Sequence, residues 1–374
     1  MLIFNTRTQN KEEFIPSEPS KVKIYVCGPT VYDLCHIGHA RSYVCFDVLK
    51  RYLIELGYRV VHIQNFTDID DKIFERARRE GVSSSEISER YINEYFKDMD
   101  ALNIMRASKY TRVTEYLQKI VEIVEKLLNS GYAYRYGNEI YFDVEASGGF
   151  GELIKNVEEF IVDSIKVEGK RKPFDFVLWK FDENGFNSKI GRGFPGWHAE
   201  CVVMSMENLG NEIDIHWGGK DLIYPHHECE SLIAKALVGK RFVKYWMHNG
   251  LVLLEGRKMS KSSSKIYIRE ILKYYPAPVL RMWILSKHYR RDLSFSEEDL
   301  NTAWKKYEKI KRAAKKAGDE ENSKTKEYIQ EFLSAMNDDM NTEKAIEVVE
   351  EFSEKNLHGL RLYKIFERVL GIEL

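Results

Sequence analysis

Hydrophobic and polar residues near the N-terminus follow a pattern that predicts an α/β fold. The β-branched and aromatic run at Val22–Val26 indicates a strand. After a glycine-containing loop, apolar residues spaced three and four apart from Phe46 to Leu56 indicate a helix. A second strand is predicted at Tyr58–Ile63. A strand, a helix and a strand in this order form a βαβ unit, so we expect a parallel sheet.

The middle of the chain departs from this pattern. Apolar residues recur at helical spacing between Thr111 and Gly131, and the glycine is placed to cap the end of that helix. Residues 132–143 then predict a β-hairpin, and the stretch that follows is polar and rich in loops. We therefore interpret residues 108–195 as an insertion into the parallel sheet.

The sheet pattern returns in the second half of the chain. Residues 212–216 predict another strand, and Pro225 is placed to open the next helix. After Ser260 the pattern is mainly helical to the end, with a charged connector near residues 315–326. We expect a helical domain at this end of the chain.

Composition excludes several classes of protein. The chain has 374 residues, of which 44% are hydrophobic and 31% charged, and a formal net charge of −1. This length suggests about two to four domains. Without a long apolar run or a signal-peptide pattern, we expect a cytoplasmic protein that makes no membrane contact. Five scattered cysteines favour metal binding or catalysis over a disulfide framework.

The loop after the first strand carries candidate chemistry. It runs from Cys27 to His39 and ends in His36-Ile37-Gly38-His39 at the predicted helix N-terminus. Backbone N–H groups and the positive end of the helix dipole favour a phosphate there, and both histidines add donors. Either histidine could instead be an ordinary surface residue, since short motifs often match by chance.

A second motif, Lys258-Met259-Ser260-Lys261-Ser262, lies far along the chain. In this order the two motifs resemble the paired signatures of class I aminoacyl-tRNA synthetases. Two independent matches arise by chance much less often than one, so nucleotide binding is favoured for both segments.

Residue spacing also suggests a metal site. His226 and Glu230 are four residues apart on the helix that Pro225 opens, so their side chains face the same way. Cys27 and Cys201 could complete a set of two sulfurs, one nitrogen and one oxygen, which suits zinc. Buried free cysteines and surface helix pairs are common, so spacing alone leaves a purely structural role open.

Longer segments make the resemblance specific. The chain is similar to the cysteinyl-tRNA synthetase family at residues 27–33, 65–72, 176–180, 195–201 and 221–228. The similarity extends to about residue 300 and continues more loosely through residues 335–342. The resemblance implies four regions: a Rossmann-like catalytic domain with parallel sheet (1–107 and 196–254), an inserted α+β connective domain (108–195), a stem-contact region with the second signature (255–300), and a truncated helical bundle (301–374).

The resemblance also implies residue roles. The implied zinc ligands are Cys27, Cys201, His226 and Glu230. The implied neighbours of the amino-acid pocket are Thr67, Trp197 and Asp221, with a plain core role for Trp197 as the alternative. The implied ATP-binding residues are His36, Gly38, His39 and Lys261, and the implied catalytic residues are His36, His39, Lys258 and Lys261.

The implied reaction is the activation of L-cysteine by ATP with Mg²⁺, followed by transfer of the cysteinyl group to the 3′ end of tRNA(Cys). Cysteine and serine are nearly isosteric, and a hydrophobic pocket would separate them by only ~1–3 kcal/mol. One zinc ion per chain, binding the substrate thiolate directly, would discriminate far better. We expect a monomer whose partners are tRNA(Cys), cysteine and ATP.

Three features depart from the family pattern. Ser262-Ser263-Ser264-Lys265 follows Lys261, where the family usually has Ser-Leu-Gly-Asn, and Trp217 stands where a small residue is usual. The sequence also ends at Leu374, where we expect the helical bundle to end, so the family's C-terminal anticodon-reading domain is expected to be absent.

Two alternatives remain at this point. Cysteine ligases of mycothiol biosynthesis share this core, act on an amino sugar and also lack the anticodon domain, but this Lys- and Glu-rich, Ala-poor composition argues against them. A catalytically silent paralogue that binds RNA or metal is disfavoured by the intact signatures. A basic run is predicted to follow tRNA phosphates or to form a solvated face: Lys305, Lys306, Lys309, Lys311, Arg312, Lys315 and Lys316.

Overall fold

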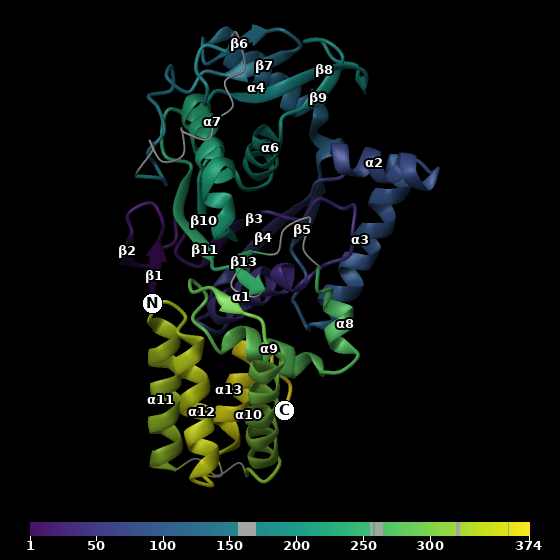
Figure 1. Ribbon diagram of the computed structural model, residues 1–374. Coiled ribbons are helices and arrows are strands. Elements are labelled where there is room, and N and C mark those ends of the chain that lie inside the picture. Colours follow the sequence, from purple (N-terminus) through teal and green to yellow (C-terminus); the bar gives the residue numbers. More distant parts are fainter. Residues whose placement is uncertain (156–169, 255–256, 259–264, 319–321, 358) are drawn as a thin grey trace.

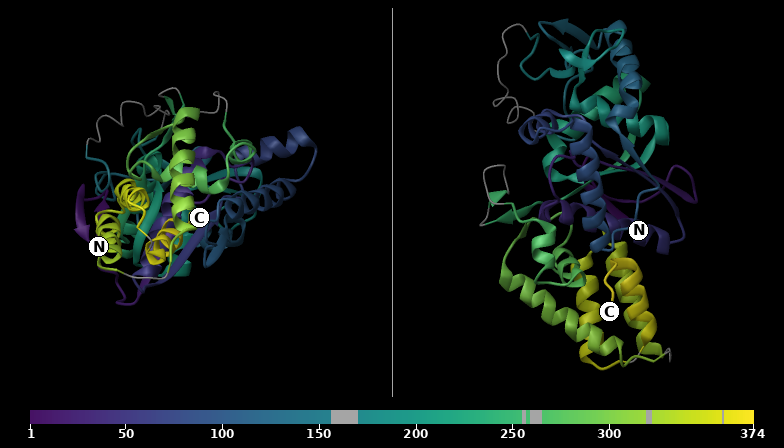
Figure 2. Two further views of the ribbon diagram at one scale, coloured as in Figure 1. Left: turned by 90° about the horizontal axis from the view of Figure 1, so that it is seen from below. Right: turned by 90° about the vertical axis from the view of Figure 1, so that its right-hand side faces the viewer.

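The computed structural model describes residues 1–155, 170–254, 265–318, 322–357 and 359–374, together with the backbone of residues 257–258. The molecule is elongated and has three parts (Figure 1). A parallel sheet with its helices lies in the middle, an antiparallel sheet lies at one end, and a bundle of helices lies at the other. The two further views show the same order (Figure 2). None of the described helices is long and apolar enough to cross a membrane.

The central sheet has five parallel strands in the order β11-β10-β3-β4-β5. Their bounds are Lys21–Val26 (β3), Arg59–Phe66 (β4), Lys109–Arg112 (β5), Ile213–Gly219 (β10) and Val243–Asn249 (β11). Helix α1 (Ile37–Glu55) connects β3 to β4, so the predicted βαβ unit is confirmed. The inner strands are rich in Val and Ile because both faces of a parallel sheet are buried.

One predicted helix begins later than its periodicity indicates. Helix α4 is Leu117–Asn129, preceded by a 3₁₀ turn at Val113–Tyr116. Thr111 belongs to β5 instead and pairs with Asn65 of β4. Pairing with the sheet edge overrides the local helical period here. Residues 109–112 are therefore part of the central sheet, and their assignment to the insertion at 108–195 is wrong.

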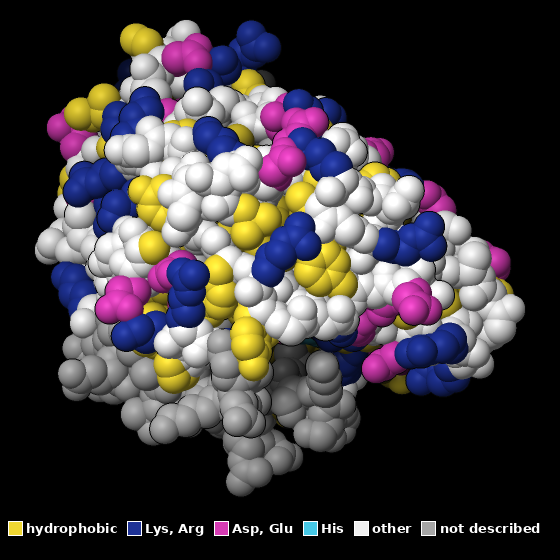
Figure 3. All heavy atoms as spheres, turned by 90° about the horizontal axis from the view of Figure 1, so that it is seen from above, with side chains coloured by type: hydrophobic (Ala, Val, Ile, Leu, Met, Phe, Trp, Pro, Cys, Tyr) yellow, Lys and Arg dark blue, Asp and Glu magenta, His cyan; other side chains and the backbone are white. Residues whose placement is uncertain are grey.

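The inserted region forms an antiparallel sheet in the order β6-β7-β8-β9. The strands are Ala133–Tyr136, Glu139–Phe142, Phe176–Phe186 and Gly193–Pro195. The predicted hairpin is confirmed, with Gly137 at φ 55° in its turn. Lys, Arg, Asp and Glu side chains are interspersed with apolar ones on the face seen from above (Figure 3). Some of the region's charges pair with each other, as in Arg171–Asp143 and Lys172–Glu145.

The remaining elements complete the three parts. The other helices before residue 240 are Asp71–Glu80 (α2), Ser84–Ala101 (α3), Trp197–Leu209 (α6) and Glu228–Val238 (α7). The later helices are Ile268–Leu272 (α8), Ala277–Leu285 (α9), Glu297–Ala314 (α10), Ser323–Asn337 (α11), Thr342–Glu354 (α12) and Leu360–Leu370 (α13). The short strands are Leu2–Asn5 (β1), Asn10–Glu13 (β2), Val252–Leu254 (β12), Arg257–Lys258 (β13) and Leu293–Ser294 (β14). The predicted helical end of the chain is confirmed.

A buried ion pair joins the helical end to the sheet. Arg281 of α9 bonds to Asp47 of α1 at 2.7 Å, and both side chains are almost fully buried. The same guanidinium donates to the carbonyl oxygens of Leu370 and Leu102. The two parts therefore form one continuous core, which fixes the helical end relative to the sheet.

Candidate metal and nucleotide site

A cleft opens at the carboxyl ends of the parallel strands, which is where open α/β sheets bind ligands. It encloses a hollow of about 350 Å³. The residues predicted from sequence that line it are Cys27, His36, Gly38, His39, Trp197 and Asp221. The structure therefore brings the first signature, one candidate metal ligand and two candidate pocket residues to one cavity.

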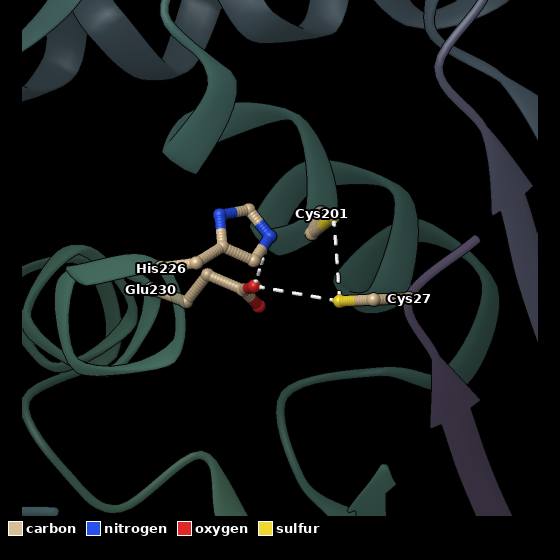
Figure 4. A group of neighbouring side chains, drawn as sticks. All are labelled: Cys27, Cys201, His226 and Glu230. Atoms are coloured by element: carbon tan, nitrogen blue, oxygen red, sulfur yellow. Dashed lines mark hydrogen bonds and ion pairs between the residues drawn. The ribbon is translucent and has the colours of Figure 1, made fainter. Parts of the chain in front are cut away.

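Four candidate metal ligands converge beside this hollow. Cys27 follows the end of β3, Cys201 lies on α6, and His226 and Glu230 come from the start of α7 and the turn before it (Figure 4). Their ligand atoms all lie within 4.8 Å of one another. The Sγ atom of Cys27 is 3.9 Å from that of Cys201 and 3.8 Å from Glu230 Oε1.

The helix that carries two of these groups begins later than predicted. Helix α7 starts at Glu228, and Pro225 lies in a π-helical turn at residues 223–227. Tyr224 within that turn has extended backbone angles. His226 and Glu230 nevertheless face each other as their spacing predicts, with Nε2 and Oε1 2.8 Å apart.

The donor set fits a metal ion. His226 Nε2 is buried and makes no hydrogen bond among the described residues, although Glu230 Oε1 lies close by. Four buried or half-buried ligand atoms within 4.8 Å of one another are the arrangement expected of ligands to a shared cation. Two sulfurs, one imidazole nitrogen and one carboxylate oxygen suit zinc.

The charges of these groups are also compatible with a cation. Burial raises the pKa of Glu230, but His216 and His226 outweigh it and bring that pKa to about 2, so the carboxylate is ionised at neutral pH. Burial lowers the pKa of His226, but the Glu230 carboxylate raises it to about 10. His226 must therefore release a proton when it binds a metal ion.

Buried histidines that the sequence analysis missed surround the ligands. His216 Nε2 lies 2.8 Å from Glu230 Oε2, and His227 Nε2 lies 3.3 Å from Cys27 Sγ. His227 Nδ1 in turn contacts His248 Nε2 at 2.7 Å. Contacts of this kind orient metal ligands. His216 and His248 lie on neighbouring parallel strands, β10 and β11, and this placement is the signal that could have identified them. The spacing of residues within a single motif does not show which strands are neighbours.

Trp197 lies over the metal group. Its ring stacks on the His226 ring with centroids 4.0 Å apart, and 45% of the residue is exposed. The interpretation of Trp197 as a core residue is therefore wrong. His198 next to it places Nδ1 3.0 Å from His226 Nδ1, and burial together with His226 lowers the pKa of His198 to about 3.

The first signature forms the N-cap of α1. His36 Nδ1 accepts from Gly38 N at 3.0 Å, and His39 Nδ1 accepts from His36 N at 3.2 Å. Because a backbone N–H can only donate, each Nδ1 is unprotonated, and the neutral rings carry their proton on Nε2. Burial lowers the pKa of His36 to about 4 and that of His39 well below its usual value. The two rings therefore offer neutral Nε2–H donors, and the Gly38 N–H is already engaged.

Other predicted residues lie nearby or outside the described part. Thr67 is buried and lines a neighbouring hollow of about 120 Å³, which it shares with Trp197. Lys258 lies in β13, where its backbone pairs with Leu253 of β12. The side chain of Lys258 and all of Lys261 fall outside the described residues.

Trp217, which stands where the family usually has a small residue, is not among the residues that line the nucleotide cleft. It is fully buried, and its ring packs against Phe46 and Tyr289 with centroids 5.9 and 5.5 Å away. The next two residues, Gly218 and Gly219, line the hollow instead. An aromatic side chain at this position therefore fills the core.

Comparisons with known proteins agree with this geometry. Residues 13–305 match the family described as tRNA synthetases class I (C) catalytic domain. The fold resembles Mycobacterium tuberculosis methionyl-tRNA synthetase in complex with methionyl-adenylate, with a TM-score of 0.69 and 15% identity, over 94% of this chain and 89% of that one. A putative arginyl-tRNA synthetase from Campylobacter jejuni gives a TM-score of 0.63 at 16% identity, over 96% and 94% of the two chains. The chain belongs to the class I tRNA synthetases.

Closer relatives define the family within this class. The Cysteine--tRNA ligase of Thermotoga maritima is 46% identical over 367 residues, which cover 94% of this chain and 80% of the relative. That of Clostridioides difficile is 45% identical over 361 residues, which cover 95% and 75%. The chain belongs to the cysteine–tRNA ligase family.

Proposed function

We propose that this protein activates L-cysteine with ATP and transfers the cysteinyl group to the 3′ end of tRNA(Cys), as a monomer in the cytoplasm. One observation carries the proposal. The group of Cys27, Cys201, His226 and Glu230 lies beside the cleft that the first signature lines, and Cys27 itself lines that cleft. A group that can recognise a thiol is thereby placed next to one that can bind phosphates.

Selection of cysteine over serine follows from the ligand group. Zinc held by these four residues would supply strong affinity for the substrate thiolate, whereas the hydroxyl of serine is a much poorer ligand. His227 supports the group by holding its Nε2 against the sulfur of Cys27. Trp197, stacked on His226 and lining the cleft, is placed to cover the bound amino acid.

Adenylate formation requires donors around the phosphates of ATP. The substrate carboxylate oxygen bonds to the α-phosphorus while the bond from that phosphorus to the departing pyrophosphate breaks, and negative charge develops on the phosphoryl oxygens. His36 and His39 would donate from Nε2 to these oxygens. Lys258 and Lys261, with Mg²⁺, would neutralise the remaining charge, and Asp221 would lie beside the pocket.

The basic run, which lies on α10 and the two residues after it, is only partly available to tRNA. Lys306 pairs with Glu350 at 2.8 Å, and Lys309 pairs with Glu350 and Glu354. The exposed residues of the run, which are better placed to meet phosphates, are Lys305, Arg312, Lys315 and Lys316. Because part of the run is paired with glutamates, we infer that fewer of its residues contact tRNA than the sequence alone suggested.

The test is amino-acid-dependent exchange of pyrophosphate into ATP. We expect exchange with cysteine and none with serine, loss of exchange after metal removal with a chelator, and its recovery when zinc is restored. Exchange that survives metal removal would contradict the proposed selection of the thiol. Absence of exchange under every condition would instead indicate a catalytically silent protein.

A further inference from the structure

A second hollow adjoins the nucleotide cleft at the first signature loop. It encloses about 260 Å³, and His36 and His39 line both this hollow and the nucleotide cleft. Its charged lining residues include Asp33, Lys72 and Lys265. The Nζ atoms of Lys72 and Lys265 lie 5.4 and 5.3 Å from the centre of the Tyr32 ring. Charged side chains and the two histidines thus line the same hollow.

Asp33 in this hollow is held by groups from a distant part of the chain. Lys265 Nζ donates to its Oδ2 at 2.6 Å, and the Tyr267 hydroxyl donates to the same oxygen at 3.2 Å. The backbone N–H of Leu34 donates to Oδ1 at 2.9 Å. The ion pair is partly exposed to water, with 23% of the Lys265 side chain and 17% of the Asp33 side chain exposed.

Backbone contacts continue this attachment along the loop. Ile37 N donates to Ile266 O, and Ile268 N donates to Cys35 O, each at 3.0 Å. These two bonds enclose His36, which forms a β-bridge with Tyr267. The loop that carries His36 is therefore joined to residues 265–268 by one ion pair and a short backbone ladder.

The attached segment is itself fixed to the catalytic domain. Arg269 bonds to Glu94 at 2.6 Å and to Asp98 at 3.0 Å, both on α3. In the sequence, Lys265 follows Lys261 by four residues. The segment that supports the first signature therefore lies shortly after the second signature in the sequence.

We propose that Lys265 is a positioning residue for adenylate formation: through its ion pair with Asp33 it holds the loop of His36 and His39 in register with the segment that follows the second signature. The inference rests on the proposed function. The charge of Lys265 also lies close enough to lower the pKa of both histidines, in addition to the effect of burial, which favours the neutral rings that donate from Nε2. Lys265 makes its contacts with Asp33 and Tyr32, so its role is exerted through the loop.

The experiment measures cysteine-dependent pyrophosphate exchange in Lys265→Met and Asp33→Asn variants of the full chain. A misplaced phosphate-binding group lowers the rate by about 10- to 100-fold, so we expect kcat to fall by that factor and KM for ATP to rise. KM for cysteine should stay unchanged, because neither Lys265 nor Asp33 is one of the four candidate metal ligands. The unfolding midpoint should also stay unchanged, since a partly exposed pair contributes little to stability.

Further variants separate positioning from a structural effect. The double variant should be no slower than either single variant, and Lys265→Arg should restore most of the rate because it keeps the ion pair. The matched control is Lys273→Met, which removes an exposed lysine paired with Glu270 and should leave exchange unchanged.

Several results would overturn the inference. The first is a wild-type exchange rate in Lys265→Met. The second is a rate loss in the double variant that equals the product of the losses in the two single variants. The third is a rate loss in Lys265→Met that comes with a lowered unfolding midpoint and is not rescued by Lys265→Arg. A wild-type protein without cysteine-dependent exchange would overturn the proposed function itself, and this inference with it. The two failures are therefore distinguishable.

Discussion

The Sγ atoms of Cys27 and Cys201 lie 3.9 Å apart, and on the scale of single residues the proposed selection of cysteine depends on this pair. Replacing Cys201 with serine exchanges a soft ligand for a poor one. Loss of a supporting residue near a metal costs about 10- to 100-fold in affinity or activity, and loss of a ligand should cost more. We expect Cys201→Ser to lose its zinc, measured by elemental analysis, and its exchange activity.

The control for this variant is Cys45→Ser, because Cys45 is also buried but lies in α1 away from the ligand group. It should keep one zinc ion per chain. Full zinc content in Cys201→Ser would count against the assignment of that sulfur as a ligand.

Buried neutral histidines give a second prediction at the residue scale. Burial lowers the pKa of both His36 and His288 to about 4, from an ordinary value of 6.5. Between these values the unfolded chain binds protons that the folded chain does not. The free energy of unfolding should therefore decrease as pH falls from 6.5 towards 4, by up to about 1.4 kcal/mol per pH unit for each histidine.

Urea unfolding at pH 7 and pH 5 measures this dependence. The variant His288→Gln removes one such group, which accepts a hydrogen bond from Arg290 N and lies 3.5 Å from Asp339. It should lose less stability than the wild type between the two pH values. Equal losses in both proteins would show that His288 is not buried in its neutral form.

On the scale of elements, the ion pair between Arg281 and Asp47 is a buried polar link between α9 and α1. Removing one partner of a buried pair leaves an uncompensated charge, and we expect Arg281→Met to lower the free energy of unfolding by about 3 kcal/mol. This is the low end of the usual range, because Arg51 still contacts Asp47 at 2.7 Å. The control Lys287→Met breaks an exposed pair with Glu343 and should cost less than about 0.5 kcal/mol. Similar unfolding curves for both variants would contradict this role of the buried pair.

On the scale of the whole molecule, the exposed part of the basic run predicts how tRNA binding depends on salt. Each lysine that meets a phosphate contributes about 0.7 to 0.9 to the slope of log K against log salt. Lys315→Gln should reduce the slope by about this amount if α10 follows the tRNA backbone. Lys309→Gln should change it less, because Lys309 already pairs with two glutamates. Filter binding at several salt concentrations measures both slopes, and equal changes would contradict the division of the run.

The sequence was sufficient to predict the parts of the molecule that depend on local pattern. The βαβ unit, the hairpin and the approach of His226 to Glu230 each follow from spacing within one or two elements. Strand β5 could not be predicted, because Thr111 adopts its extended conformation by pairing with Asn65, which is distant in the sequence. The same limit applies to Lys265, whose partner Asp33 is 232 positions away in the sequence. Only the folded chain shows which distant groups meet.

Transfer of cysteine to tRNA tests the central claim most directly. Purified protein, zinc and ATP are incubated with tRNA(Cys), and charged tRNA is separated from uncharged tRNA on an acid gel. We predict that cysteine accumulates on tRNA(Cys) and that serine does not. Activation of cysteine without charging of tRNA(Cys), but with transfer to an amino sugar, would contradict the assignment of tRNA as the acceptor.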